Sequence, residues 1–326
     1  NKNKNKILYV CPEFTIIDSY RILMDPITSW FRLDKVYPRV QTLEKLYILP
    51  KKLPPSTKKF TANKNESIYN EIKDDLYRNI ILKYNLVVIG TYAYNQLIEL
   101  LKIKSYKKRL VKNNVLECLL FVNKIDGKEL KMTTIANKKI NKIYKQIKKH
   151  LILNHNIKSS AITYNTYNKF IDLYGYSDEL LINNVPIIRI YTTNKCIPFH
   201  NSHNNINIGS FYLILYLLMS QKFKSRVSSQ KNSDKKYTYM IQNLLYLRES
   251  WYKNKEMDGL ENTLFKELGI NCIGENIHTD FQIKYKKKKI LKYVPNSKNI
   301  SDSKKEIEKL TNKYELEIMD GNIINK

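Results

Sequence analysis

The chain has 326 residues, of which 43% are hydrophobic and 25 are tyrosine, and its formal net charge is +27. This length can bury one large core or two ordinary ones, and the composition excludes a disordered polar chain. The longest apolar run, Phe211–Met219, is too short to cross a bilayer, and the first residues lack the apolar stretch of a signal peptide. We therefore expect a soluble, folded protein without membrane segments.

The basic charge predicts a polyanionic partner, and nucleic acid is the usual one. An alternative stays open, because Lys, Asn, Ile and Tyr dominate the sequence and all four have A/T-rich codons. An AT-rich genome alone could produce this composition.

The four cysteines, Cys11, Cys118, Cys196 and Cys272, lie far apart in the sequence. Disulfide scaffolds cluster their cysteines, so this spacing favours a reducing compartment. The spacing of Cys196, His200 and His203 resembles part of a zinc site, but no fourth ligand follows at a suitable distance, so we expect loop histidines.

Several elements are expected in the N-terminal half from periodicity and turn signals. Pro38 is expected to kink a helix that starts near Asp25-Pro26, or to begin a second one. We predict a strand at Ile7–Phe14, a linker at 50–66, a helix at Ser67–Tyr84, a strand within 85–94, a helix at Tyr94–Ile103, a strand at Val115–Val122, a turn at Asp126-Gly127 into a strand at Leu130–Ile135, and a lysine-rich helix at Asn137–Leu153.

The C-terminal half is expected to contain a buried central helix within Asn204–Arg226, because this segment is strongly apolar with a basic end. We also predict strands at Ser160–Tyr164 and Val185–Tyr191, helices around Tyr167–Leu173, at Tyr237–Tyr252 and at Leu260–Leu268, a basic run at Lys284–Lys292, and a polar tail. The order predicts a mixed α/β (α+β) fold.

Three segments together resemble the catalytic subunits of poly(A) polymerases from large DNA viruses of the poxvirus, asfarvirus and mimivirus type. They are ILYVCPEFTIIDSYRILMDPITSWFRLDKVYPRVQTLEKLY, the pair NNVPIIRIYTTNKCIPFH and INIGSFYLILYLLMSQKFKSR, and YTYMIQNLLYLRESWY. They cover most of the chain in the family's order. The resemblance implies a nucleotidyltransferase-like fold with a degenerate second domain.

The resemblance further implies which part of the enzyme this is. In the family, a Gly-Ser turn, an Asp-x-Asp pair and a third Asp hold two divalent metals, and all lie upstream of the segment that opens this chain. The chain begins at NKNKNK without Met, so we expect a fragment or a processed product. We predict residues 1–60 as the tail of the catalytic module, 61–295 as the degenerate domain and 296–326 as a polar tail.

A segment within the chain, VVIGTYAY, resembles the Gly-Ser turn of a nucleotidyltransferase, with Gly90 and Thr91 in the positions of the Gly and the Ser. The following strand, VLECLLFV, has Glu117 as its only acid, and Leu119 stands where a second carboxylate belongs. One carboxylate cannot hold two metals, so we predict no metal site here. Mg²⁺ or Mn²⁺ is expected only for the parent enzyme.

The candidate nucleotide- or RNA-binding residues are basic side chains in three places. Arginine is preferred for bidentate phosphate contacts, but each group could equally be a solvated surface. They are Arg32, Lys35 and Arg39 on one helical face; Lys107, Lys108 and Arg109; and Lys286 and Lys287 in the basic run. Tyr20 and Tyr37 could stack on bases, although core packing is the simpler interpretation.

The resulting hypothesis is a non-catalytic portion of a viral polymerase that adds AMP from ATP to mRNA 3′ ends. This part would grip RNA and contact the upstream catalytic module, with a second copy or a processivity subunit as further partners, in cytoplasmic viral factories and virions. The first alternative is a basic RNA-binding module, ribosome- or organelle-associated, from an AT-rich genome. The second is an interaction protein whose charge reflects only that genome.

Overall fold

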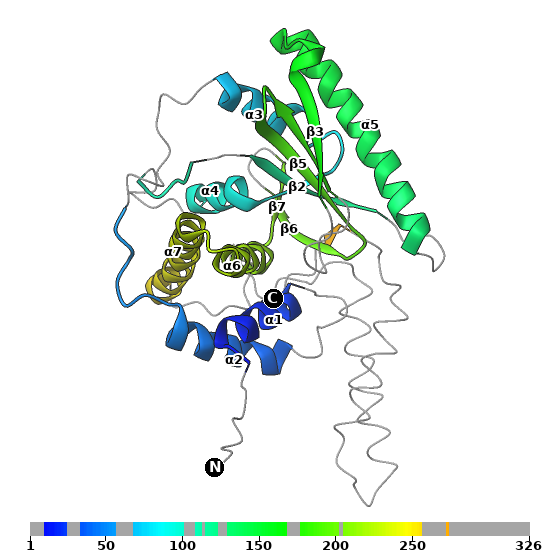
Figure 1. The fold of residues 1–326 in the computed structure, drawn as a ribbon. Coiled ribbons are helices and arrows are strands. Elements are labelled where there is room, and N and C mark those ends of the chain that lie inside the picture. The colour runs from blue at the N-terminus through cyan, green and yellow to red at the C-terminus, as the bar shows by residue number, and fades with distance from the viewer. Residues whose placement is uncertain are drawn as a thin grey trace, which may run out of the picture.

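A computed structural model describes most of the chain between residues 10 and 273 (Figure 1). The described residues are 10–24, 33–56, 68–100, 108–112, 115–122, 129–167, 177–201, 205–255 and 272–273. The boundaries predicted at residues 60 and 295 lie outside them, so the division into domains stays a prediction. Among the described residues, no helix combines the length and the apolar character that a membrane crossing requires.

An eight-stranded mixed sheet of described residues forms the centre of the fold, in the order β3-β4-β5-β2-β1-β7-β6-β8. The β2–β5 and β1–β7 pairs are parallel, and the remaining pairs are antiparallel. The strands are β1 Val87–Ile89, β2 Leu116–Phe121, β3 Ile162–Tyr167, β4 Ser177–Ile182, β5 Val185–Thr193, β6 Ile197–Asn201, β7 Asn207–Gly209 and β8 Cys272–Ile273.

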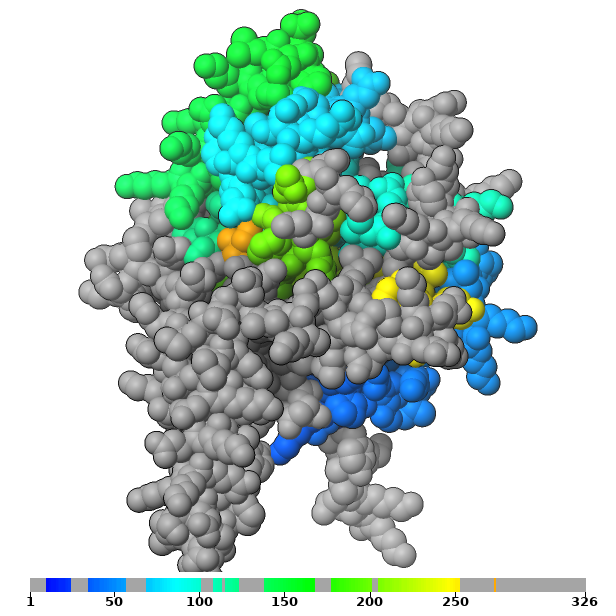
Figure 2. Space-filling view, turned by 180° about the vertical axis from the view of Figure 1, so that it is seen from behind, coloured from blue at the N-terminus to red at the C-terminus, as the bar shows by residue number. Residues whose placement is uncertain are grey.

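Helices cover the sheet on two sides: α5 lies along one side, and α4, α6 and α7 lie together on the other, with α1 and α2 beyond α6 (Figure 1). The space-filling view from behind shows α3 and α5 side by side at one end of the molecule and α1 and α2 at the other (Figure 2). The helices are α1 Pro12–Leu23, α2 Leu33–Tyr47, α3 Ile68–Asn79, α4 Gly90–Leu100, α5 Glu129–His155, α6 Phe211–Val227 and α7 Lys231–Lys255, with a 3₁₀ turn at Ser159–Ala161.

Helix α6 is the predicted central helix. Ser210 caps it by accepting a hydrogen bond from the Leu213 N–H at 3.3 Å, and every residue from Phe211 to Ser220 is buried. A helix that is apolar all round must be covered on every side, and here it packs against α1, α4 and α7.

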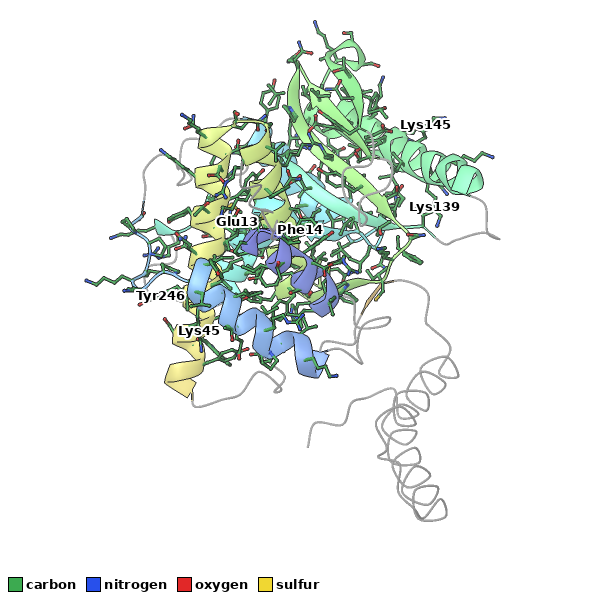
Figure 3. All side chains as sticks on the ribbon, turned by 60° about the horizontal axis from the view of Figure 1, so that its bottom comes forward. Glu13, Phe14, Lys45, Lys139, Lys145 and Tyr246 are labelled. Carbon is green, nitrogen blue, oxygen red and sulfur yellow. The ribbon has the colours of Figure 1, made fainter. Side chains whose placement is uncertain are left out.

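Polar contacts fasten α1 and α2 to this core. The Arg248 guanidinium on α7, 1% exposed, donates to Glu44 of α2 at 2.5 Å, and Tyr20 of α1 donates to the same carboxylate at 2.6 Å. Glu13 of α1, labelled in Figure 3, accepts from Lys222 at 2.6 Å and also from Arg226. Tyr20 is thus a buried core residue, and the base-stacking interpretation of its ring is wrong.

Several predicted elements differ from the structure. Residues 12–14 belong to a helix rather than a strand, because Pro12 occupies the first helical turn, where its missing N–H costs nothing. Pro38 lies inside one continuous helix, so no second helix starts there. Residues 130–135 are part of α5 rather than a strand, α4 starts at Gly90, and Asn207–Gly209 is a strand ahead of α6.

The cysteine interpretation also needs correction. Cys11 and Cys118 are free, but Cys196 is disulfide-bonded, so its sulfur is not a thiolate that could ligate zinc. Strand β8, which begins at Cys272, pairs with β6 directly after Cys196. The inference of a reducing compartment from sequence spacing alone is therefore not supported.

The buried Glu44–Arg248 pair generates a stability prediction. We expect Glu44→Gln to lower the free energy of unfolding by about 3 kcal/mol, because it removes the buried carboxylate that pairs with Arg248 and leaves the guanidinium only the half-buried Glu249 carboxylate at 3.0 Å. Urea denaturation measures the change. Asp18→Asn, which breaks the exposed Asp18–Arg21 pair, is the control and should cost about 0–1 kcal/mol. Equal costs for the two variants would refute the structural role of Glu44.

Candidate degenerate nucleotidyltransferase site

The turn between β1 and α4 brings two of the predicted site residues into contact. Gly90 has a φ of +66° and begins α4, and Ile89 before it pairs with Glu117 on β2. A Cβ built on Gly90 would lie 2.1 Å from Glu117 Oε2. Glycine is therefore required at this position for two reasons: the positive φ, and the absence of space for a side chain. Thr91 follows, buried, in the first turn of α4.

Glu117 belongs to a row of charged residues across three neighbouring strands. The register pairs Glu117 of β2 with Arg189 of β5, and Arg189 with Glu179 of β4. We call these three residues the Glu–Arg–Glu row. The Arg189 guanidinium forms a close ion pair with the carboxylate of Glu179, and Glu179 is 1% exposed.

Two tyrosines complete the hydrogen bonding of the row. Arg189 donates to the Tyr191 hydroxyl at 3.1 Å, and that hydroxyl donates to Glu117 Oε1 at 3.1 Å. Tyr167 donates to Glu179 Oε2 at 2.7 Å, and the centre of its ring lies 4.4 Å from Arg189 Cζ. The guanidinium is therefore linked to both carboxylates, directly to one and through a hydroxyl to the other.

The surroundings shift the pKa values within the row. Burial raises the pKa of Glu117 above its usual value, although Arg189, the Tyr191 hydroxyl and Lys236 oppose the shift. Burial lowers the pKa of Lys236 on α7, against the attraction of Glu117. Burial alone would lower the pKa of Arg189, but Tyr191, Glu179 and Glu117 raise it, so the guanidinium stays charged.

This arrangement is unsuited to two-metal chemistry. A metal pair needs several carboxylates whose oxygens are free to coordinate, whereas here Glu179 pairs with the Arg189 guanidinium and Glu117 accepts from the Tyr191 hydroxyl. The Glu117 carboxylate also lies against the first residue of α4, where a helix N-terminus would otherwise attract a phosphate. Negative charge at that position disfavours a triphosphate.

The predicted basic residues are not brought together at this site. Lys35 and Arg39 are exposed on α2, and Lys108 is exposed in the loop before β2. Arg109 is a correction: it is 8% exposed, and its Nη1 donates to Pro54 O at 2.7 Å and to Asn243 Oδ1 at 2.8 Å, so it braces the fold. Arg32, Lys107, Lys286 and Lys287 lie outside the described residues, as does His203.

Sequence reasoning missed a basic stripe on α5. It consists of Lys138, Lys142, Lys145 and Lys149, all exposed at helical spacing. We call these residues the α5 lysine stripe. Figure 3 labels Lys145 and the neighbouring Lys139 on this helix, on the other side of the molecule from Lys45 of α2. The sequence signal was the lysine-rich helix itself, from which no site residue was taken.

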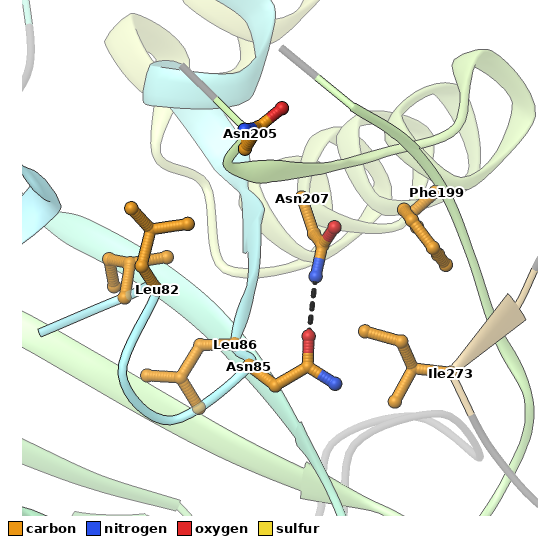
Figure 4. Close-up of a pocket in the computed structure, with 8 residues that line it drawn as sticks. Leu82, Asn85, Leu86, Phe199, Asn205, Asn207 and Ile273 are labelled. Atoms are coloured by element: carbon orange, nitrogen blue, oxygen red, sulfur yellow. Dashed lines mark hydrogen bonds between the residues drawn. The ribbon is translucent and has the colours of Figure 1, made fainter.

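A pocket of about 330 Å³ lies at the opposite end of β1 from Gly90 (Figure 4). Its wall includes Leu82, Leu86, Phe199 and Ile273, and Asn207 donates to Asn85 Oδ1 at 2.7 Å across it. None of the described residues that line it is charged, so these residues offer no counter-charge to a nucleotide phosphate.

Comparison with known proteins identifies relatives of this fold. Residues 58–324 match a family model described as the C-terminal part of the catalytic subunit of the APMV poly(A) polymerase. A protein of Acanthamoeba polyphaga mimivirus, named as a poly(A) polymerase catalytic subunit, is 24% identical over 297 residues, covering 83% of this chain and 48% of that protein.

A solved structure shares the fold. The crystal structure of the Megavirus polyadenylate synthase superposes with a TM-score of 0.67 at 20% identity, covering 94% of this chain and 60% of that one. The chain thus spans about half the length of the mimivirus relative and three fifths of the Megavirus one.

The raised pKa of Glu117 generates a pH prediction. Below the usual value of 4.5 the carboxyl is protonated in both the folded and the unfolded state; as the pH rises through the higher folded pKa, the wild type loses stability. Glu117→Gln does not titrate there. We therefore expect its stability relative to wild type to increase from pH 4 to pH 7, by about 1.4 kcal/mol for each unit of raised pKa.

Urea denaturation at a series of pH values measures this difference. Asp18→Asn, at an exposed position, is the control and should show no comparable rise. If the free energy of unfolding of Glu117→Gln relative to wild type falls as the pH rises, the attraction of Glu117 to its neighbouring cations has a larger effect on its pKa than burial has.

Proposed function

The chain belongs to the family of C-terminal parts of APMV-type poly(A) polymerase catalytic subunits, and from this premise we propose that it is the non-catalytic portion of a viral polymerase. The parent enzyme would transfer AMP from ATP to mRNA 3′ ends, with Mg²⁺ or Mn²⁺ held by aspartates of an upstream catalytic module. The portion described here would grip the RNA and contact that module or a partner subunit.

The single observation that carries the proposal is the position of the Arg189 guanidinium. It lies between Glu117 and Glu179 in the register of the sheet, and Glu117 lies against the turn at Gly90, which we take as the counterpart of the Gly-Ser turn of a nucleotidyltransferase. One fixed cation of a single charge stands among these carboxylates. This supports a domain that keeps the nucleotidyltransferase framework and has exchanged its metals for an internal ion pair.

The α5 lysine stripe is the surface we propose for RNA contact. Its four lysines span twelve residues of helix, and the first and last are about 16 Å apart at the rise of an α-helix. Lysine side chains act as point charges toward phosphates, so this stripe suits sequence-independent contact with an RNA backbone. Lys35, Arg39 and Lys108 remain further candidates for such contacts, and viral factories and virions remain the proposed locations.

The competing function is that of a basic RNA-binding module that acts without a catalytic partner. This function would explain the net positive charge of the chain equally well, but the family match over residues 58–324 favours the polymerase. The two functions differ in whether ATP-dependent tail synthesis can be reconstituted around the chain.

An adenylation assay tests the proposal. We expect the chain alone to add no tail to a labelled RNA primer with ATP and Mg²⁺ or Mn²⁺, and we expect tails when the upstream coding region is expressed with it. An upstream segment whose Asp-x-Asp pair is changed to Asn should abolish them. Tails that the chain adds alone, and that disappear in Glu117→Ala, would overturn the non-catalytic assignment. If neither the chain alone nor the chain with the upstream region adds tails, the RNA-binding module is favoured.

RNA binding tests the α5 lysine stripe. Changing its four lysines to Gln should weaken binding to single-stranded RNA at least about tenfold. It should also reduce the slope of log K against log salt by up to about 3, near 0.7 for each RNA phosphate that the variant no longer neutralises. The matched control changes four exposed lysines elsewhere, Lys51, Lys52, Lys231 and Lys235, to Gln. Equal losses in both variants would show that overall charge, and not the stripe, binds RNA.

A further inference from the structure

Three potential metal ligands meet where α3 packs against the C-terminal end of α5. Asp75 of α3 presents its Oδ2 to two imidazoles of α5: His150 Nε2 lies 2.5 Å from it and His155 Nε2 lies 2.7 Å from it. The three ligand atoms all lie within 4.8 Å of one another. Figure 2 shows the two helices side by side on the surface at this end of the molecule.

The local structure directs both histidines to the same carboxylate. His155 is the last residue of α5, and Asn156 after it has a φ of +53°, which turns the chain back while the Ile157 N–H donates to Leu151 O at 3.3 Å. His150 lies more than one helical turn earlier, so the helix end brings together two side chains that ordinary helical spacing would separate.

Further hydrogen bonds orient the ligands from behind. Asn79, one turn after Asp75, donates to Asp75 Oδ1 at 2.5 Å and leaves Oδ2 facing the imidazoles. The Asn154 amide lies 3.1 Å from His150 Nδ1. When Nε2 uses its lone pair for a metal, Nδ1 carries the proton, and a rotated Asn154 amide can accept it through its oxygen. Such supporting contacts are typical of metal-binding histidines.

We propose that Asp75, His150 and His155 bind a divalent transition metal, with Zn²⁺ as the ion that suits them best, and that this ion fastens α3 to the end of α5. Two imidazoles and one carboxylate form an established ligand set for Zn²⁺, with water in the fourth position. The side chains are 18–26% exposed, so an ion can enter from solvent. Mg²⁺ prefers an all-oxygen set and does not suit this one.

The geometry requires a modest opening. Ligand atoms about 2.1 Å from a tetrahedral Zn²⁺ lie about 3.4 Å from one another, so the two histidine nitrogens must withdraw from Asp75 Oδ2 by about 0.7–0.9 Å. Rotation of exposed side chains can supply this movement. Without the ion, the same three groups hydrogen-bond directly. Burial alone would raise the pKa of Asp75, but the hydrogen bonds from His155 and His150 lower it below its usual value.

Calorimetric titration of the whole chain, stripped of metal with a chelator, tests the proposal. We expect one Zn²⁺ to bind with at least about tenfold loss of affinity in Asp75→Asn and in His150→Gln, and no binding of Mg²⁺ at the same site. Asp74→Asn is the matched control: this neighbouring carboxylate is contacted by the Tyr92 hydroxyl at 3.3 Å and takes no part in the cluster. Its Zn²⁺ affinity should equal that of the wild type.

A second pair of variants separates metal binding from a merely structural hydrogen-bond network. His155→Cys retains a zinc ligand and should keep the affinity within about tenfold, whereas His155→Gln should lose it. Zn²⁺ should raise the melting temperature of the wild type, of Asp74→Asn and of His155→Cys, and should leave that of His155→Gln unchanged. Absence of a one-to-one Zn²⁺ complex in the wild type, or equal affinity in wild type, Asp75→Asn and His150→Gln, would overturn the proposal.

Discussion

The need to bury helix α6 on every side organises the rest of the molecule. Its first ten residues, Phe211–Ser220, are all buried, which leaves no face for solvent. The sheet and α4 alone cannot surround a cylinder, so α7 and the N-terminal helices must close the remaining sides. This explains why Glu44 and Tyr20, distant in sequence, meet Arg248 in the core. The polar contacts determine which helices pack around α6, whereas burial of the apolar surface of α6 supplies most of the free energy that favours this packing.

The Glu–Arg–Glu row places one guanidinium between two carboxylates in the register of the sheet. Its carboxylates lie on β2 and β4, on either side of β5, and carboxylates placed close together repel one another unless a cation lies near them. Here Arg189 supplies positive charge covalently, with tyrosine hydroxyls completing the hydrogen bonds. Arg189 pairs with Glu179, and the Tyr191 hydroxyl donates to Glu117. The turn at Gly90 accommodates the Glu117 carboxylate because glycine has no side chain there.

The sequence predicted those elements whose own residues determine them. Helix α6 and strands β2 and β5 follow from apolar and β-branched runs, and the turn at Gly90 follows from a strand-turn-helix pattern, whereas its contact with Glu117 was not predicted. Strand β4 was missed because it begins with Ser177, Asp178 and Glu179, which are poor strand formers. Their partners lie on other strands, so tertiary contacts override the local preference.

Registers and distant contacts were beyond sequence reasoning. Glu179 meets Arg189 because Asn183 and Asn184 form a two-residue hairpin, with both φ values positive, that sets the pairing of β4 with β5. The buried state of Arg109 depends on Pro54 and Asn243, far from it in sequence. Asp75 and His155 are separated by 80 positions, and no local pattern joins them.

The residues with positive φ show at which turns several residue types are tolerated and at which turn only glycine fits. Of the seven described residues with positive φ, five are Asn, one is Ser and one is Gly. Asn tolerates this conformation better than other residues with a side chain, so a genome rich in A and T can place Asn codons at such turns at small cost. Gly90 is the exception, because the Glu117 carboxylate occupies the space of its missing side chain. At this turn an Asn could not replace the glycine whatever the composition of the gene, because its Cβ would overlap the Glu117 carboxylate.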